Sequence, residues 1–198
     1  MANLIFKYSL ILGSLILGFN TTFFNPKSIN NMTDQKKKYG IEGQQAHELA
    51  LDIEWVDKDG NEREAIQLSN YKNKFKVIYG FQAWCPGCHS RGLPALKKMV
   101  DALKENDQVA FFAIQTVFEG ARANTKEKML EIQKKYELPI PFGHDVGNKQ
   151  TGNRSSTMYN YRTGGTPWFI FINQNDTVVF NDYHLDVEKA IDFLKEVQ

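Results

Sequence analysis

The sequence predicts a three-layer α/β domain in which a central mixed sheet is flanked by helices. Three short runs rich in β-branched and aromatic residues have the character of buried strands, at residues 76–83, 109–115 and 168–172. Segments with apolar residues at helical spacing separate them, and this alternation is typical of a sheet covered by helices. A further short strand at 178–180 follows an Asn-Gln-Asn-Asp turn, pairs with the strand before it and makes the sheet mixed.

Length and composition exclude several classes of protein. The chain has 198 residues, with 24 basic and 23 acidic side chains, so its size fits one globular domain plus extra length. Binding of nucleic acid is not expected, because domains that bind it carry clustered Lys and Arg. Two cysteines are too few for a framework of stapling disulfides, and no metal site is predicted.

Residues 1–24 are predicted to be a signal peptide or a membrane anchor. Lys7 precedes an apolar run from Tyr8 to Phe19, which has about the length of a signal-peptide core. No small-residue cleavage site follows, so an uncleaved anchor formed by residues 4–24 is an alternative to a cleaved signal. Both interpretations place the rest of the chain outside the cytoplasm, in the periplasm or cell envelope, and Lys7 agrees with the positive-inside rule.

A polar tether is predicted at residues 25–45, which are poor in large apolar side chains, and the globular domain is expected at 46–198. The domain begins with a predicted hairpin. Its turn is Asp57-Lys58-Asp59-Gly60 and its second strand spans Ala65 to Leu68. The first strand is indicated by apolar residues that alternate with polar ones: Leu51, Ile53 and Trp55.

Three helices are predicted from apolar spacing and capping residues. The first begins at the cysteines, and Pro94 is expected to kink it. Asn124, with Glu127, is expected to cap the second helix, and Asp186 the last. The buried faces are formed by Leu93, Leu96, Val100 and Leu103 in the first helix, by Met129, Leu130 and Ile132 in the second, and by Ala190, Ile191 and Leu194 in the third.

The two cysteines lie in the motif Trp84-Cys85-Pro86-Gly87-Cys88, where a buried strand ends and a helix begins. The first amides of a helix are unpaired and its dipole is positive there, so a thiolate is favoured. Cys85 is expected to be the attacking thiolate and Cys88, one turn further, the thiol that resolves the mixed disulfide. Pro86 suits the first helical turn, which needs no N–H from it.

From about Ala65 to Gln198 the chain resembles the thioredoxin superfamily, and in particular the exported thiol-disulfide oxidoreductases similar to TlpA and ResA. The matching residues are the lead-in Leu68 to Lys74, the segment Ala83 to Cys88, Pro94, and Gly165-Thr166-Pro167 before a strand. The resemblance implies a thioredoxin-like fold and a reaction with protein thiols and disulfides. No soluble cofactor is implied, and a membrane thiol-electron transporter is implied as a partner.

The same resemblance implies roles for individual residues. Pro167 would be preceded by a cis peptide bond and face the disulfide, and Thr166 would present its backbone to the substrate. Trp84 and Pro86 are expected to complete the substrate contact. The sequence also departs from the family, because Tyr79 and Arg91 stand where an aspartate and a glutamate are common, and because the stretch from Phe118 to Gly164 is longer than a minimal thioredoxin needs.

Other readings of the motif remain open at this point. A peroxiredoxin-like thiol peroxidase would have a threonine three residues before its reactive cysteine, where this chain has Gln82. Cys85 to His89 also matches the C-x-x-C-H haem attachment pattern, with His89 as one axial ligand and a methionine as the other. The candidate methionines are Met99, Met129 and Met158.

A non-enzymatic protein could use the two thiolates with a histidine to bind Cu(I). The candidate histidines are His144 and His184, both expected on the surface or in loops. A last group, considered for the substrate groove, is assigned to core packing or turns: Asp145, Tyr159, Tyr161 and Trp168. Structural thiols are the remaining alternative for the cysteine pair.

Overall fold

The computed structural model describes residues 39–198. The predicted amino-terminal signal or anchor and most of the predicted tether lie outside the described residues. Within residues 39–198, no helix has both the length and the apolar character needed to cross a membrane.

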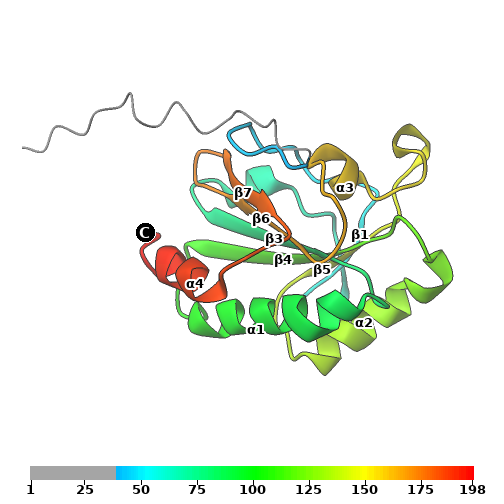
Figure 1. Ribbon diagram of the computed structural model, residues 1–198, viewed down its shortest axis with the longest axis horizontal. Helices are drawn as coiled ribbons and strands as arrows, with labels where there is room; N and C mark the ends of the chain where they lie inside the picture. The colour runs from blue at the N-terminus through cyan, green and yellow to red at the C-terminus, as the bar shows by residue number, and fades with distance from the viewer. Residues whose placement is uncertain (1–38) are drawn as a thin grey trace, which may run out of the picture. The chain divides into compact units, whose positions relative to one another are not determined.

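A seven-stranded sheet has the order β2-β1-β5-β4-β3-β6-β7 (Figure 1). The central strands β3, β4 and β5 are parallel, while β1, β6 and β7 are antiparallel to their neighbours, which confirms the predicted mixed sheet. The strands are β1 Glu54–Val56, β2 Glu62–Arg63, β3 Phe75–Phe81, β4 Val109–Thr116, β5 Phe142–Asp145, β6 Trp168–Ile172 and β7 Val178–Asp182.

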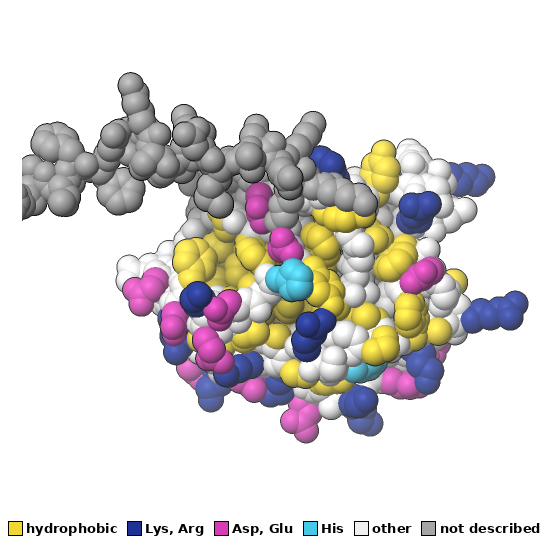
Figure 2. Space-filling model, viewed as in Figure 1, with side chains coloured by type: hydrophobic (Ala, Val, Ile, Leu, Met, Phe, Trp, Pro, Cys, Tyr) yellow, Lys and Arg dark blue, Asp and Glu magenta, His cyan; other side chains and the backbone are white. Residues whose placement is uncertain are grey.

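Helices cover both faces of this sheet. Figure 1 shows α1, α2 and α4 along one face and the short α3 on the other. Their bounds are α1 Leu93–Ala102, α2 Lys126–Lys135, α3 Ser156–Asn160 and α4 Val187–Lys195. The lower edge in Figure 2, where α1, α2 and α4 lie, carries mostly charged side chains, as expected for the outer faces of amphipathic helices.

Two apolar cores result from the two-residue period of the strands. In β3, Val77, Tyr79 and Phe81 belong to the core under α1, α2 and α4, whereas Ile78 belongs to the core on the opposite face. Because both faces are covered, β3, β4 and β6 are mostly apolar, which is why they were recognisable in the sequence.

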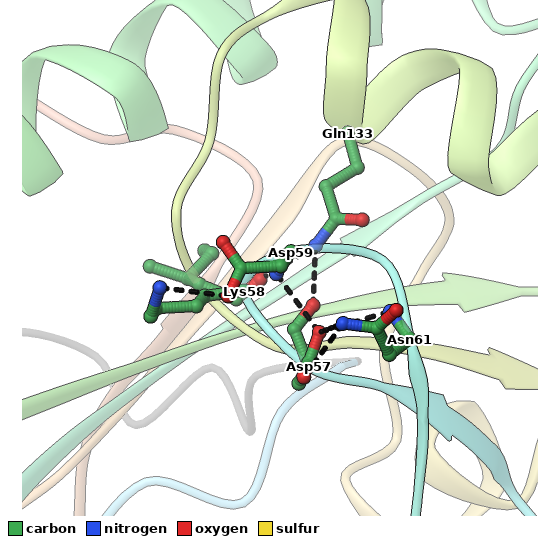
Figure 3. A network of polar contacts seen from close by, with 6 residues as sticks. Asp57, Lys58, Asp59, Asn61 and Gln133 are labelled. Carbon is green, nitrogen blue, oxygen red and sulfur yellow. Dashed lines mark hydrogen bonds and ion pairs between the residues drawn. The ribbon is translucent and has the colours of Figure 1, made fainter.

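The predicted first hairpin forms, but the position predicted for its second strand, Ala65 to Leu68, is wrong. β1 pairs with Glu62–Arg63, and the segment that was expected to be extended instead leads into a 3-10 turn at Leu68–Tyr71. The turn reverses the chain early because Asp57 Oδ1 accepts hydrogen bonds from the backbone N–H groups of Asp59 and Asn61. The amide of Gln133, in α2, donates to the Asp57 carbonyl at 2.8 Å and holds this turn against the helix (Figure 3).

β5 was not predicted, because Gly143, His144 and Asp145 do not look like a buried strand. It is buried nonetheless, between β4 and β1. The expectation of a surface or loop position for His144 is therefore wrong: its Nδ1 lies 2.7 Å from Oε1 of Gln115. Asp145 is buried too, and its carboxylate accepts hydrogen bonds from Ser155, Ser156 and Thr157 at the start of α3.

The aromatic residues considered for the substrate groove lie partly in the core and partly on the surface. Tyr161 and Trp168 are buried in the second core, as predicted, whereas Tyr159 is exposed on α3.

Candidate active site

The two cysteines lie where β3 leads into the first helix. Pro86 and Gly87 begin the helical segment, a π turn runs through Cys88–Gly92, and α1 continues from Leu93. The Leu93 N–H donates to the Cys88 carbonyl, five residues back. Pro94, where a kink was expected, stands in the first turn of α1, directly after this π turn, where its missing N–H is tolerated.

The sulfur atoms differ in access. Cys85 is 7% exposed and Cys88 is fully buried, and both are free thiols. The backbone N–H of Cys88 donates to Sγ of Cys85 at 3.4 Å, and the Cys85 thiol donates to the Thr166 carbonyl at 3.5 Å. The first thiol therefore has a helix N–H aimed at it and is the more accessible of the two, which is the arrangement an attacking thiolate needs.

The loop before β6 packs directly against this turn. The Thr166–Pro167 peptide bond is cis, as the resemblance implied. A Cβ added to Gly87 would lie 3.3 Å from Cδ of Pro167, so proline and active-site turn are in contact. Two motifs that are 81 residues apart in the chain thus meet at Cys85.

The predicted contact residues line this junction at different depths. Trp84 is 45% exposed and Pro86 is exposed, whereas Thr166 is half-buried and Pro167 is buried. The Trp84 indole lies over the loop at Gly120, where an added Cβ would be 3.1 Å from Nε1. The exposed pair forms the rim of the site and the other two form its floor.

The environment of Cys88 disfavours its thiolate. Burial raises the pKa of this thiol from its usual value near 9 to about 12, and the side-chain hydrogen bond with Cys85 adds to the rise. A hydrogen bond to the backbone of Gln82 acts in the opposite direction. At neutral pH the second thiol is therefore protonated and does not compete with Cys85 as the nucleophile.

Stability of the reduced protein is expected to fall in alkaline solution because of this thiol. The unfolded chain releases the Cys88 proton above about pH 9, whereas the folded protein retains it to about pH 12. The contribution is complete below pH 9 and is lost as pH rises through this window. Between about pH 8 and pH 11 the free energy of unfolding should fall by about 2 kcal/mol more than in Cys88→Ala, measured by urea denaturation in reductant. Parallel curves for the two proteins would contradict this.

His89 and Arg91, which follow the cysteines in the π turn, both form contacts with other residues. His89 Nε2 lies 2.7 Å from the Ala83 carbonyl and Nδ1 lies 2.8 Å from the Tyr136 hydroxyl. Arg91 donates to the Tyr183 hydroxyl and stacks over that ring. With both ring nitrogens of His89 bonded, axial ligation of a haem iron would first require breaking one of these contacts.

No group of three or more His, Cys, Asp or Glu side chains able to hold a metal ion occurs in residues 39–198. Of the histidines considered for copper, His144 is buried against Gln115 and His184 is exposed beside Tyr183. Neither arrangement favours the copper alternative.

Asn124 is a site residue that the sequence did not reveal. It was expected to cap α2, but Thr125 caps that helix by accepting from the Lys128 N–H. Asn124 is buried; its Oδ1 accepts from the Ala83 N–H at 2.7 Å and its amide donates to the carbonyls of Glu119 and Gly120. The side chain joins the segment before Trp84 to the loop beneath the indole.

Asn124→Ala is expected to lower the free energy of unfolding by about 2 kcal/mol, because the partly buried Ala83 N–H and the carbonyls of Glu119 and Gly120 would lose their partner. Thr125→Ala is the matched control, since it removes only a helix cap at the adjacent position and should cost about 1 kcal/mol. Chemical denaturation of the three proteins checks this, and a smaller loss in Asn124→Ala than in Thr125→Ala would disprove the role.

Comparison with known proteins gives the family. The sequence model of the Redoxin family matches residues 42–193. No curated protein matches the chain significantly.

Solved structures share the fold. A thioredoxin-like superfamily protein is 27% identical with a TM-score of 0.67, and the match covers 77% of this chain and 95% of the other. A thiol-disulfide isomerase from Corynebacterium glutamicum is 25% identical with a TM-score of 0.64, covering 77% of this chain and 96% of the other. A reduced 2-Cys peroxiredoxin from Plasmodium vivax is 18% identical with a TM-score of 0.58, covering 79% and 96%. The chain therefore belongs to the Redoxin family and is a thioredoxin-like oxidoreductase.

Proposed function

We propose that this protein is a thiol-disulfide oxidoreductase that acts on protein disulfides and dithiols through Cys85 and Cys88. The observation that carries the proposal is the asymmetry of the two thiols. Cys85 keeps 7% exposure and has the Cys88 N–H aimed at its sulfur, whereas Cys88 is fully buried with a raised pKa. Cys85 is suited to attack the substrate disulfide, and Cys88 is suited to react only after a mixed disulfide has formed.

In the reducing direction the reaction proceeds in two exchanges. The Cys85 thiolate attacks one sulfur of the substrate disulfide, forming a mixed disulfide and releasing the other substrate sulfur as a thiolate, which takes up a proton. Cys88 then loses its proton to solvent and attacks Sγ of Cys85. The Cys85–Cys88 disulfide forms, the second substrate thiolate leaves and is protonated, and two electrons have passed to the substrate. The oxidising direction is the reverse.

The substrate polypeptide is placed by the four residues around Cys85. Thr166 has its carbonyl at Cys85 Sγ, so an extended substrate segment lying along this loop would bring its own cysteine to the attacking sulfur. The exposed faces of Trp84 and Pro86 offer apolar contact on the other side.

A redox titration of the full chain, combined with an insulin-reduction assay, tests the proposal. We expect a reversible two-electron couple between about −270 and −120 mV, the range of thioredoxin-like relatives. Insulin reduction should exceed consumption of hydrogen peroxide. The absence of a reversible dithiol couple would refute the proposal, and peroxide consumption faster than disulfide exchange would favour the peroxiredoxin-like alternative.

The predicted amino-terminal segment supports an extracytoplasmic location. We infer that the domain works in the periplasm or cell envelope, anchored by residues 4–24 if the segment is not cleaved, and exchanges electrons with a membrane thiol transporter. Recovery of the protein in the cytoplasmic fraction after cell fractionation would contradict this.

A further inference from the structure

The Tyr79 hydroxyl is a buried polar group at the candidate active site that has no hydrogen-bond partner. The residue is fully buried in β3. Its hydroxyl lies under the π turn, since a Cβ added to Gly92 would be 2.2 Å from it and 2.6 Å from Cβ of Pro167. A buried hydroxyl without a partner costs free energy in the resting protein, which suggests that it is used in another state.

Packing holds this hydroxyl in place. The Tyr79 ring is stacked on Phe81 with centroids 5.8 Å apart, and it contacts Phe169 at 4.9 Å. Neither aromatic neighbour can accept a conventional hydrogen bond. The ring cannot move far, so its hydroxyl stays directed at the space between the active-site helix and the cis-proline loop.

Cys88 begins the same π turn as Gly92, and among the neighbouring groups its charge acts most strongly on the Tyr79 hydroxyl. The pKa of Tyr79 is raised well above its usual value, mainly by burial, and further by the charge of Cys88 and then by those of Cys85 and Tyr136. Tyr79 therefore remains a phenol at neutral pH. It can donate a hydrogen bond but cannot serve as the base that takes the Cys88 proton.

We propose that the Tyr79 hydroxyl donates a hydrogen bond to the Cys88 thiolate during resolution of the mixed disulfide. This inference rests on the proposed function. When Cys88 loses its proton to solvent, its sulfur gains a negative charge in a buried site. The Tyr79 hydroxyl, which had no hydrogen-bond partner, then has an acceptor. The thiolate then attacks Cys85 Sγ, the new disulfide forms, and the leaving substrate thiolate is protonated by solvent. Tyr79 keeps its own proton throughout.

The other polar and titratable groups around Cys88 either act on it through their charge or are hydrogen-bonded to other residues. The titratable groups that act on the pair are Cys85, in the active-site turn, and Tyr136, which ends α2. His89, in the π turn, is bonded to Tyr136 and to the Ala83 carbonyl. Arg91, in the same turn, is bonded to Tyr183.

Rapid mixing of the reduced full chain with dithionitrobenzoate tests the role. Attack by Cys85 releases one coloured thiolate, and attack by Cys88 on the resulting mixed disulfide releases the second. Tyr79→Phe should leave the first phase within about twofold and slow the second about three- to tenfold. A hydrogen bond to a charged group shifts the pKa of Cys88 by about one to two units, and the higher nucleophilicity of a more basic thiolate cancels about half of that effect.

The second phase should stay slower by a similar factor across about pH 7 to 10, because Cys88 is mostly protonated throughout that range. The melting temperature of reduced Tyr79→Phe should be no lower than that of the wild type, because the lost hydroxyl had no partner. A residue needed only for packing would change stability and leave the second phase unaltered.

Tyr161→Phe is the matched control. Tyr161 is also buried, but its hydroxyl donates to the His47 carbonyl in the other core, so both phases should match those of the wild type. A second phase in Tyr79→Phe equal to that of the wild type would overturn the inference. If the wild type released only one thiolate, the proposed function itself would fail, and the two failures are thus distinguishable.

Discussion

Replacing Cys85 by serine is expected to reduce insulin-reducing activity by roughly a thousandfold, because the side chain that opens the substrate disulfide is then a neutral hydroxyl. The buried Cys88 cannot take over, because its pKa of about 12 keeps it protonated at neutral pH and no substrate disulfide reaches it. Initial rates with the wild type and the variant at equal concentration give the measurement.

Cys88→Ala should fail in a different way. Its Cys85 still attacks, but nothing resolves the mixed disulfide, so the protein should accumulate as a covalent complex with its substrate. A non-reducing gel reveals the complex, and added dithiothreitol should dissolve it. If Cys85→Ser formed the covalent complex instead, the assignment of attacking and resolving thiols would have to be reversed.

Gly92→Ala is expected to lower the free energy of unfolding by about 2 kcal/mol. The added methyl would overlap the Tyr79 hydroxyl, at 2.2 Å, and Cβ of Pro167, at 2.6 Å, and neither can move freely. Alanine favours a helix over glycine by about 1 kcal/mol, but overpacking of about 3 kcal/mol exceeds that gain. Because the same methyl would displace Pro167 from the active-site turn, insulin reduction should fall as well.

Ser90→Ala serves as the control for this substitution. Ser90 is an exposed residue of the same π turn, so alanine there gains helix propensity without a new contact, and stability should be unchanged or slightly higher. Chemical denaturation and insulin assays of the two variants check the pair. A Gly92→Ala protein as stable as Ser90→Ala would show that the helix can move away from Tyr79 and Pro167.

The central strands and the place of the cysteines were predictable because their signals are local. A run of apolar residues covered on both faces marks a buried strand wherever it lies, and β3, β4 and β6 were found in this way. β5 and the second strand of the hairpin were not, because each is short and polar. Gly143 to Asp145 form a strand only because β4 and β1 lie on either side of them.

The roles of polar side chains were the hardest to predict. Asn124 has the sequence pattern of a helix cap, yet in the fold it binds Ala83 N–H from 41 residues away, while its neighbour Thr125 caps the helix. His144 was expected on the surface or in a loop and is buried against Gln115, whereas Asp145, which was assigned to core packing or a turn, is buried with Ser155 as a partner. A polar side chain with several possible partners takes the one that packing brings to it.

By itself, the sequence determined that two cysteines stand at a strand-to-helix junction with two residues between them, and that a threonine-proline pair precedes a later strand. Only the tertiary structure decided that Thr166 contacts Cys85 and that Cys88 is the more deeply buried of the two thiols. It also decided that the Tyr79 hydroxyl lies beneath Gly92 without a hydrogen-bond partner. The physical reason is the distance along the sequence between the residues that interact. The periodicity of a strand or helix can be recognised from neighbouring residues, whereas burial and tertiary contacts depend on segments that only folding brings together.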